Sequence, residues 1–383
     1  KNKYTSAPGV MPDGLTWETA TTTDVGLDFG SLNGKFRFSG DYYIRKTTDM
    51  YTVGQTLPDI FGADSPKGNY ADMTTKGWEI TLAYRDLLAD KPFNYEIRGT
   101  LSDYISTIDR YNNQDGKLSD YYSGMRVGEI WGYVTEGLFQ SQEEIDNHAD
   151  QTLIQSSSQR VTYPGDVKIK DLNNDGVIDY GNNTLDDHGD KKIIGNSLPR
   201  FAYSLNLSAD WNNFFFSAFF QGVGKQDWYP SNECIFWGQY NRPYNNLPVW
   251  HVGNYWTEDN RDAYLPRYAG YNSSIKETPQ TRYLQNVAYI RLKNLQFGYN
   301  LPQSVVSKLR MQNARLYISA ENLWCWSPLY KNTRDLDVTN IYGSDPDLTD
   351  ADMSSGLNGN RGSGDGNSYP QMTSVSLGVS VTF

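Results

Sequence analysis

One stretch of the chain carries oxygen-bearing residues at the spacing that a calcium ion needs. Acidic and amide side chains recur at every second position, and a glycine stands where a metal-binding loop turns sharply. The candidate ligands are Asp171, Asn173, Asp175, the backbone carbonyl of Val177, and Asp179. The twelfth position of the loop holds Asn182 in place of the usual bidentate glutamate. Two interpretations therefore remain open: a calcium site, and a turn braced by its own side chains.

A second stretch is rich in aromatic side chains, whose faces can stack on sugar rings or on peptide side chains. The candidate substrate contacts are Trp228, Tyr229, Trp237, Tyr240, Tyr244 and Trp250. The packed interior of a long loop would contain the same residue types. The sequence alone does not choose between ligand contact and loop packing.

No combination of residues indicates catalysis. The three histidines lie in predicted loops without metal-ligand spacing between them: His148, His188 and His251. Cys234 and Cys325 are the only cysteines; they can pair or stay free, and no base accompanies either one. Neighbouring carboxylates such as Glu143 and Glu144 are more typical of a solvated loop than of an acid–base pair. The sequence therefore predicts a protein that is not an enzyme and requires no cofactor.

Composition narrows the class of protein further. The chain has 383 residues and a formal net charge of −11, which argues against a nucleic-acid partner. Its mean hydropathy is −0.65, and no apolar run is long enough for a transmembrane helix. Neither property excludes strands that cross a membrane, because the walls of β-barrels alternate apolar and polar residues.

The segments between the calcium-loop and aromatic stretches have the sequence pattern of β-strands. Between Phe201 and Trp211 the apolar residues occupy the odd positions, which predicts one apolar and one polar face. Asn212–Asn213 can form a two-residue turn, because asparagine tolerates positive φ. That turn places Trp211 opposite Phe214 and Leu205 opposite Phe220, so both strands share their apolar face.

The same pattern recurs along the chain. Asn33–Gly34 predicts a hairpin that pairs Phe29 with Phe38. A bulge is expected near Lys293–Asn294, and a helical turn before Leu309. In all, nine strands are predicted, at about residues 21–29, 35–45, 78–85, 93–101, 201–211, 214–223, 289–300, 316–321 and 374–383.

The connections between these strands alternate between short and long. Short turns at one end and long loops at the other are typical of outer-membrane barrels, whose interior is wet. We therefore predict an all-β, antiparallel transmembrane β-barrel, with short periplasmic turns and long extracellular loops. Leu205 and Leu207 should face lipid together with Phe201, and the lumen should be lined by Arg200, Asn206 and Asp210. A soluble, secreted all-β carbohydrate-binding protein or glycoside hydrolase remains the alternative.

Several segments also carry a family resemblance. They include LTWETATTTDVGLDFG (Leu15–Gly30), GDYYIRKTTDMY (Gly40–Tyr51), PGDVKIKDLNNDGVID (Pro164–Asp179), IIGNSLPRFAYSLNLS (Ile193–Ser208), YIRLKNLQFGYNLP (Tyr289–Pro302), ARLYISAENLW (Ala314–Trp324) and the terminal VSLGVSVTF. These segments resemble the SusC/RagA family of TonB-dependent transporters of the bacterial outer membrane. The resemblance implies a barrel of about twenty-two strands, an N-terminal plug, and a SusD-like surface lipoprotein that covers the barrel as a lid.

What the resemblance implies for this chain can be stated as expectations. Residues 1–383 contain no recognisable plug, TonB box or signal peptide, so they should form the C-terminal part of the barrel domain. TonB would act through an absent N-terminal part, which would also supply the plug and the remaining strands. Oligosaccharide or oligopeptide would be imported, with outer-membrane lipid around the wall. The lid should contact Asp103–Leu198 and Gly224–Asn286, and Phe383 should end the strand that the assembly machinery recognises.

Overall fold

The structure, a computed structural model, describes residues 14–54, 66–88, 93–155, 161–230, 234–270, 278–334, 336–338 and 371–383. Its main feature is one antiparallel sheet of nine strands. In sheet order these are β1 (Thr19–Ser31), β2 (Phe36–Val53), β3 (Lys67–Leu88), β4 (Phe93–Arg110), β9 (Arg200–Trp211), β10 (Phe214–Lys225), β15 (Tyr289–Asn300), β16 (Asn313–Trp326) and β17 (Ser374–Thr382). The predicted all-β, antiparallel architecture is confirmed.

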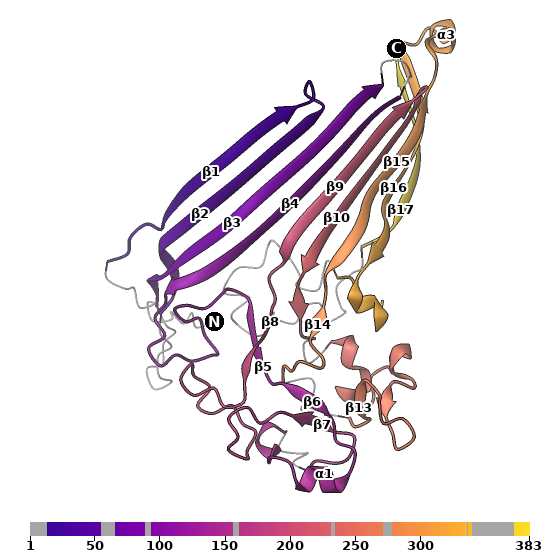
Figure 1. Ribbon diagram of the computed structural model, residues 1–383. Helices are drawn as coiled ribbons and strands as arrows, with labels where there is room; N and C mark the ends of the chain where they lie inside the picture. Colours follow the sequence, from indigo (N-terminus) through magenta and orange to yellow (C-terminus); the bar gives the residue numbers. More distant parts are fainter. Residues whose placement is uncertain are drawn as a thin grey trace, which may run out of the picture.

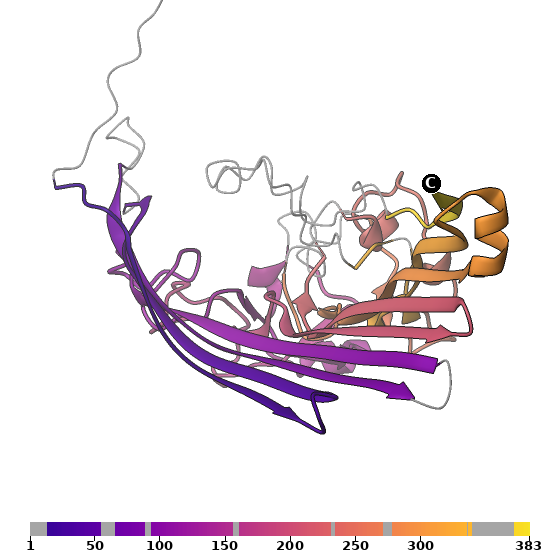
Figure 2. The same cartoon turned by 90° about the horizontal axis from the view of Figure 1, so that it is seen from above.

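The nine strands form one curved wall (Figures 1 and 2). The short hairpin turns and the C-terminus lie at one end of the wall, and the long connections gather at the other end (Figure 1). The outermost strands, β1 and β17, each pair with a single neighbour in the described part of the chain. The wall is therefore open along both edges, as the count of nine strands predicts.

Both predicted hairpin registers are confirmed. Phe29 lies opposite Phe38, and Trp211 lies opposite Phe214. The turn residues have the positive φ that such tight turns need: 46° and 73° at Asn212 and Asn213, and 56° at Asn33. The short connection between the predicted third and fourth strands includes residues 89–92, which lie outside the described residues.

The predicted irregularities of the seventh and eighth strands are also present. The register of β15 against β10 shifts between Phe219 and Phe220, which pair with Asn294 and Leu292, so Lys293 is the extra residue of a bulge. After β15 the chain forms the helical turn that the sequence indicates, in two pieces, α3 (Gln303–Val306) and η5 (Ser307–Leu309).

The first strands are longer than predicted. The second, third and fourth strands were predicted at about residues 35–45, 78–85 and 93–101, but β2 continues to Val53, β3 begins at Lys67, and β4 continues to Arg110. These extensions are polar, so they lack the two-residue apolar period. Arg110 joins them through ion pairs with Asp72 (2.6 Å) and Asp49 (3.0 Å).

One face of the wall is apolar across all nine strands. One row of paired residues runs through Phe93, Trp211, Phe214, Tyr299, Leu316 and Val379. This face is exposed; Leu27 retains 64% of its surface and Leu377 81%. Soluble proteins rarely leave so large a continuous apolar surface open to water.

Aromatic side chains mark both margins of this apolar face. At the short-turn end, Phe214 lies 4.7 Å from Tyr299 and 6.4 Å from Trp211, measured between ring centroids. At the other end, Trp326 lies opposite Ile290. Nine residues separate Ile290 from Tyr299, which is about 21 Å along the membrane normal for a strand tilted by about 45°. The band thus matches the apolar belt of about 25 Å that surrounds outer-membrane barrels.

The long connections fold into a globule at the loop end of the wall (Figure 1). We call the described parts of residues 111–199, 226–288 and 327–338 the loop globule. Among the described residues, no helix is long and apolar enough to cross a membrane. The globule's elements are β5 (Glu129–Gly132), β6 (Thr135–Leu138), α1 (Gln142–Asp146), η2 (Thr152–Ile154), β7 (Val167–Ile169), β8 (Lys192–Asn196), β11 (Asp227–Trp228), η3 (Ile235–Tyr240), η4 (Val249–His251), β12 (Tyr255–Trp256), β13 (Leu265–Arg267), β14 (Gln285–Asn286) and η6 (Pro328–Lys331).

Candidate functional site

The inner face of the wall is polar wherever the outer face is apolar. Asn206 lies opposite Arg98 in the register, whereas its neighbours Leu205 and Leu207 lie opposite Gly99 and Ile97. The facing predicted for Leu205, Leu207 and Asn206 is therefore confirmed by the pairing. Strict alternation starts only after Phe201, because that residue has a φ of 55°.

An ion pair holds the first residue of β9 in place. Arg200 donates from its guanidinium to both carboxylate oxygens of Asp103 on β4, and the backbone N–H of Phe201 donates to the same carboxylate. The Asp103 side chain is only 6% exposed. This contact fixes the point at which the chain leaves the loop globule and enters the wall.

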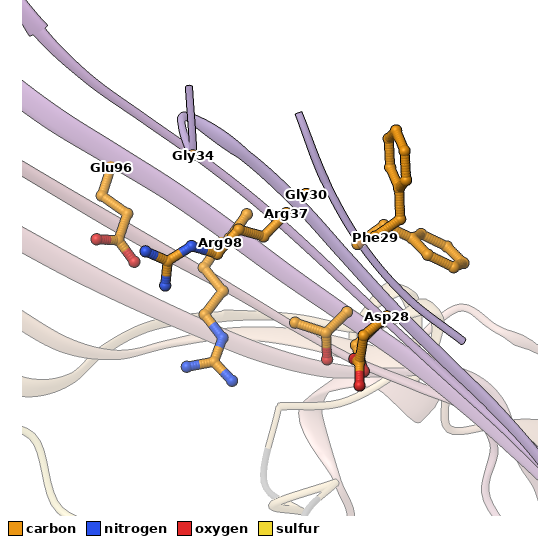
Figure 3. Close-up of a pocket in the computed structure, with 11 residues that line it drawn as sticks. Asp28, Phe29, Gly30, Gly34, Arg37, Glu96 and Arg98 are labelled. Atoms are coloured by element: carbon orange, nitrogen blue, oxygen red, sulfur yellow. The ribbon is translucent and has the colours of Figure 1, made fainter. Parts of the chain in front are cut away.

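A hollow of about 490 Å³ lies on the inner face of β1–β4. Figure 3 shows Arg37, Glu96 and Arg98 pointing to one side of the sheet and Phe29 to the other. Ser39 and Thr81 add hydroxyl groups to the lining. Within the described residues, Arg37, Glu96 and Arg98 form no ion pair. A polar surface of mixed charge such as this can bind polar partners, and its described lining contains no arrangement for covalent chemistry.

The three histidines contact backbone carbonyl groups. Each has one ring nitrogen within hydrogen-bond distance of a carbonyl oxygen: His148 with Ile169 (2.7 Å), His188 with Gly189 (3.1 Å) and His251 with Phe236 (2.9 Å). In the part of the chain that the structure describes, no three His, Cys, Asp or Glu side chains are gathered as a metal ion would require.

The aromatic stretch forms the core of the loop globule. One buried cluster combines side chains from all three long connections, such as Ile169 from the first, Trp237 from the second and Leu329 from the third. Trp237 packs edge-to-face against Phe236 (5.0 Å) and Tyr283 (5.8 Å). The three connections therefore share one hydrophobic core and are not independent loops.

Three of the six predicted substrate contacts are packed in the interior of the loop globule, which is the alternative interpretation. Trp237 and Tyr240 are fully buried, and Trp228 retains only 2% of its surface. Their polar groups are satisfied inside the protein: the Trp237 indole donates to the carbonyl of Pro230 (3.3 Å), and the Tyr240 hydroxyl donates to that of Pro266 (2.7 Å). In this conformation these three side chains are packed in the interior and offer no face to a ligand, so a substrate contact at them stays a prediction.

The other three predicted contacts differ in exposure. Tyr229 and Trp250 are half-buried, and the Tyr229 hydroxyl donates to the carbonyl of Thr278 (3.1 Å). Tyr244 is 72% exposed. Three exposed aliphatic residues follow it within the next eight positions of the chain; sequence reasoning missed them, because scattered aliphatic residues in a loop have no periodicity. We call this set the apolar loop patch: Tyr244, Leu247, Val249 and Val252.

The candidate calcium loop is closed by its own side chains. Asp171 accepts from the backbone N–H groups of Asn174 (2.6 Å) and Gly176 (2.9 Å), and Asp175 accepts from that of Val177 (2.8 Å). These bonds are those of the braced turn. A buried carboxylate that we did not predict, Asp190, accepts from the N–H groups at both ends of the loop, Leu172 and Asp179. Calcium binding by Asp171, Asn173, Asp175, Val177 and Asp179 stays a prediction.

Two further expectations concern the cysteines and the C-terminus. Of the two alternatives for the cysteines, the structure does not have the disulfide between them: Cys234 is buried, and Cys325 is half-buried. Phe383 follows β17 and is 79% exposed, at the short-turn end of the wall. Its role as an assembly signal stays a prediction.

Burial shifts the pKa of His251. Its imidazole is fully buried between the rings of Trp250 (4.2 Å), Tyr240 (5.7 Å) and Tyr268 (6.4 Å). Burial lowers the pKa of His251 from 6.5 to about 4, although the bond to the Phe236 carbonyl opposes this shift. Its Nδ1 atom has no hydrogen-bond partner within the described residues. The folded loop globule therefore contains a neutral imidazole.

Acid is expected to loosen the loop globule through His251. Because the folded pKa is depressed, this histidine's contribution to stability is complete above pH 6.5 and is lost as the pH falls towards 4. The loss should reach about 3 kcal/mol. Tryptophan fluorescence between pH 7 and pH 4 would measure the transition. A His251→Phe variant keeps the aromatic packing and should unfold at lower pH; identical profiles for the two proteins would contradict the prediction.

The sequence of the chain was compared with those of known proteins. No family model matches the chain. The chain is 28% identical over 97% of its length to TonB-dependent receptor P3 of Formosa agariphila, and 23% identical over 99% to TonB-dependent receptor SusC of Bacteroides thetaiotaomicron. These matches cover 35% and 33% of the two receptors. The chain thus spans about a third of the length of the curated relatives it matches.

Solved structures show the same fold. The chain superposes on the RagAB peptide transporter with a TM-score of 0.61, at 19% identity, over 82% of this chain and 32% of the other. The relatives are receptors and transporters, in agreement with the prediction that the chain is not an enzyme. The resemblance seen in the sequence is confirmed: the chain is similar over nearly its whole length to TonB-dependent receptors, SusC among them, and its strands have the fold of part of an outer-membrane β-barrel.

Proposed function

We propose that the whole protein imports an oligosaccharide or an oligopeptide across the outer membrane by TonB-dependent transport. This chain would supply part of the barrel wall and a folded extracellular globule. The observation that carries the proposal is the wall itself, with an exposed apolar outer face and a polar inner face. The names of the relatives support import, and the neighbour RagAB is described as a peptide transporter. For this chain we retain both substrate classes, oligosaccharides and oligopeptides, in the proposal.

The wall also argues against the alternative class. A soluble, secreted carbohydrate-binding protein or glycoside hydrolase would need its apolar face covered. Val25, Leu316 and Leu377 instead retain 71%, 49% and 81% of their surface. The aromatic residues that would form a sugar platform are largely in the core of the loop globule. Membrane transport accounts for both features.

The proposal includes strands and a plug from an N-terminal part of the same protein. Backbone groups along β1 and β17 that have no partner strand would be costly in lipid, where water cannot satisfy them. An additional segment with an odd number of strands would close the wall. The plug in that segment would contact the polar inner face, and TonB would act through it.

A SusD-like lipoprotein lid is proposed to dock on the loop globule. The apolar loop patch is the surface that fits such a partner best, since Val249 is 88% and Val252 66% exposed at the loop end of the wall. Residues 103–110, which we had included in the lid surface, belong to β4. The lid contact is therefore expected on the parts of residues 111–198 and 224–286 that form the globule.

The test is made in cells that carry the full-length protein. Val249→Asp should reduce recovery of the lipoprotein with the barrel by about tenfold or more, because a carboxylate buried in the contact has no partner. Uptake of labelled oligosaccharide or oligopeptide should decrease with it. The matched control is Val53→Asp, at a valine that is 37% exposed at the end of β2 and lies outside the residues proposed for the lid contact.

The outcomes separate the parts of the proposal. Equal lipoprotein recovery for Val249→Asp and for the unchanged protein would exclude the patch as the lid contact. Uptake that persists in cells without TonB would exclude TonB-dependent import itself. The labelled compound that enters, sugar or peptide, identifies the substrate class.

A further inference from the structure

The connection between β15 and β16 is longer than a hairpin at this end of the wall requires. The β9–β10 hairpin turns with two residues, Asn212 and Asn213. The β15–β16 connection instead contains α3 and η5, which project beyond the strands at the short-turn end (Figure 1). We call the segment from Gln303 to Arg310 the terminal helical turn.

The terminal helical turn covers the outer face of the wall. Ala314 pairs with Val381, two residues before Leu316, so its side chain is on the outer, apolar face. Leu316 and Ile318 on this face are 49% and 51% exposed, but Ala314 is only 5% exposed. The helix packs against β16, and its Val306 is 1% exposed. The burial of both Ala314 and Val306 at this end of the wall places the terminal helical turn on the lipid side of the strands.

The same turn leaves apolar side chains uncovered. Val305 is 41% and Leu309 54% exposed. Residues four apart lie on one side of a helix, and Val305 is the neighbour of the buried Val306, so the three form one apolar stripe. Ser304 lies on the side away from Val306 and is exposed.

Basic residues flank this stripe. Lys308 is exposed in η5, and Arg310 is exposed at its C-terminal end with a φ of 58°. In the part of the chain that the structure describes, neither forms an ion pair. Long basic side chains can bury their aliphatic stems at a membrane surface and extend their charge to the headgroups.

The stripe continues the aromatic margin of the apolar face. Tyr299 is three residues before Pro302, the N-cap of the helix, and its ring centroid lies 4.7 Å from that of Phe214, with the two rings tilted. Aromatic rings, exposed aliphatic side chains and basic residues at one level are the pattern of a segment that lies in a membrane interface.

We propose that the terminal helical turn docks on the surface of the lipid bilayer. Val305 and Leu309 enter the boundary between headgroups and acyl chains, and Lys308 and Arg310 bind the phosphates of anionic phospholipids. The turn thereby fixes the depth of β15 and β16 in the membrane. This proposal rests on the transmembrane fold and is independent of what the barrel transports.

The test uses the full-length protein in vesicles of phosphatidylcholine and phosphatidylglycerol, with its native cysteines replaced. Single cysteines at Val305, Leu309 or Ser304 carry an environment-sensitive fluorophore. At Val305 and Leu309 we expect blue-shifted emission, strong quenching by lipids that are spin-labelled near the headgroup, and weak quenching by aqueous iodide. Ser304 is the matched control within the same turn and should show the reverse.

Two results would overturn the proposal. One is iodide quenching at Val305 and Leu309 equal to that at Ser304, which would place the stripe in water. The other is protection from iodide without quenching by labelled lipid, which would show that protein covers the stripe. The anionic component is tested with Lys308→Gln combined with Arg310→Asn. This change should abolish the increase in lipid quenching between pure phosphatidylcholine and the mixture, and an unchanged increase would remove the two basic residues from the site.

Discussion

Lysine at position 205 is expected to destabilise the barrel by about 2–4 kcal/mol. Leu205 lies opposite Gly99 and Phe220 in the apolar row that includes Leu82, and all of them face outward. Six residues separate it from Trp211 at the aromatic margin, which is about 14 Å along the membrane normal and close to the middle of the band. An ammonium group there loses its hydration without gaining a partner. Urea unfolding of the full-length protein in lipid vesicles would measure the cost.

The matched control is the next residue of the same strand. Asn206 lies opposite Arg98 on the inner face, so Asn206→Lys puts the same charge at the same depth into a wet lumen. We expect its effect on the free energy of unfolding to remain below about 1 kcal/mol. If lysine is tolerated at position 205 but not at 206, the two faces of the wall have been assigned the wrong way round.

Removing the guanidinium of Arg291 should cost about 3–5 kcal/mol. Arg291 donates to the carboxylate of Asp337 (2.6 Å) and to the side-chain oxygen of Gln371. The backbone N–H of Gln371 donates to the second oxygen of Asp337 (3.2 Å), 34 residues away in the sequence. The side chains of Arg291 and Asp337 are only 6% and 10% exposed. Arg291→Met would leave this carboxylate buried without its cation.

Two variants test this explanation for Arg291. Arg110→Met removes an exposed arginine, 46% accessible, from its ion pairs with Asp72 and Asp49, and should cost less than about 1 kcal/mol. The double change Arg291→Met with Asp337→Leu should cost less than Arg291→Met alone, because no buried carboxylate remains. Similar unfolding curves for Arg291→Met and Arg110→Met would show that burial does not determine the strength of these pairs.

The strands could be predicted because each carries its own signal. A half-buried strand in a barrel has an apolar residue at every second position, and Asn212–Asn213 and Asn33–Gly34 fix the pairing register within two hairpins. The extra residue at Lys293 was visible as a break in the same period. The extensions to Val53 and Arg110 were missed because strands outside the apolar band have no lipid-facing side.

The loop globule could not be predicted in this way. Its core combines side chains from connections that are far apart in the sequence; the Thr135 side chain, for example, donates to Gln280, 145 residues away. An aromatic residue that contacts a ligand and one that fills a core have the same local pattern. Sequence alone thus left Trp237 as a candidate contact, and tertiary packing placed it in the interior.

The sequence by itself determined the two faces of the wall, the hairpin registers and the family resemblance, because alternation, turn chemistry and segment similarity are local properties. Only the tertiary structure decided which aromatic side chains are buried, that Asp190 braces the candidate calcium loop, and that Val306 of the terminal helical turn packs on the outer face of β16. These features depend on contacts between segments, and local pattern cannot specify which segments meet.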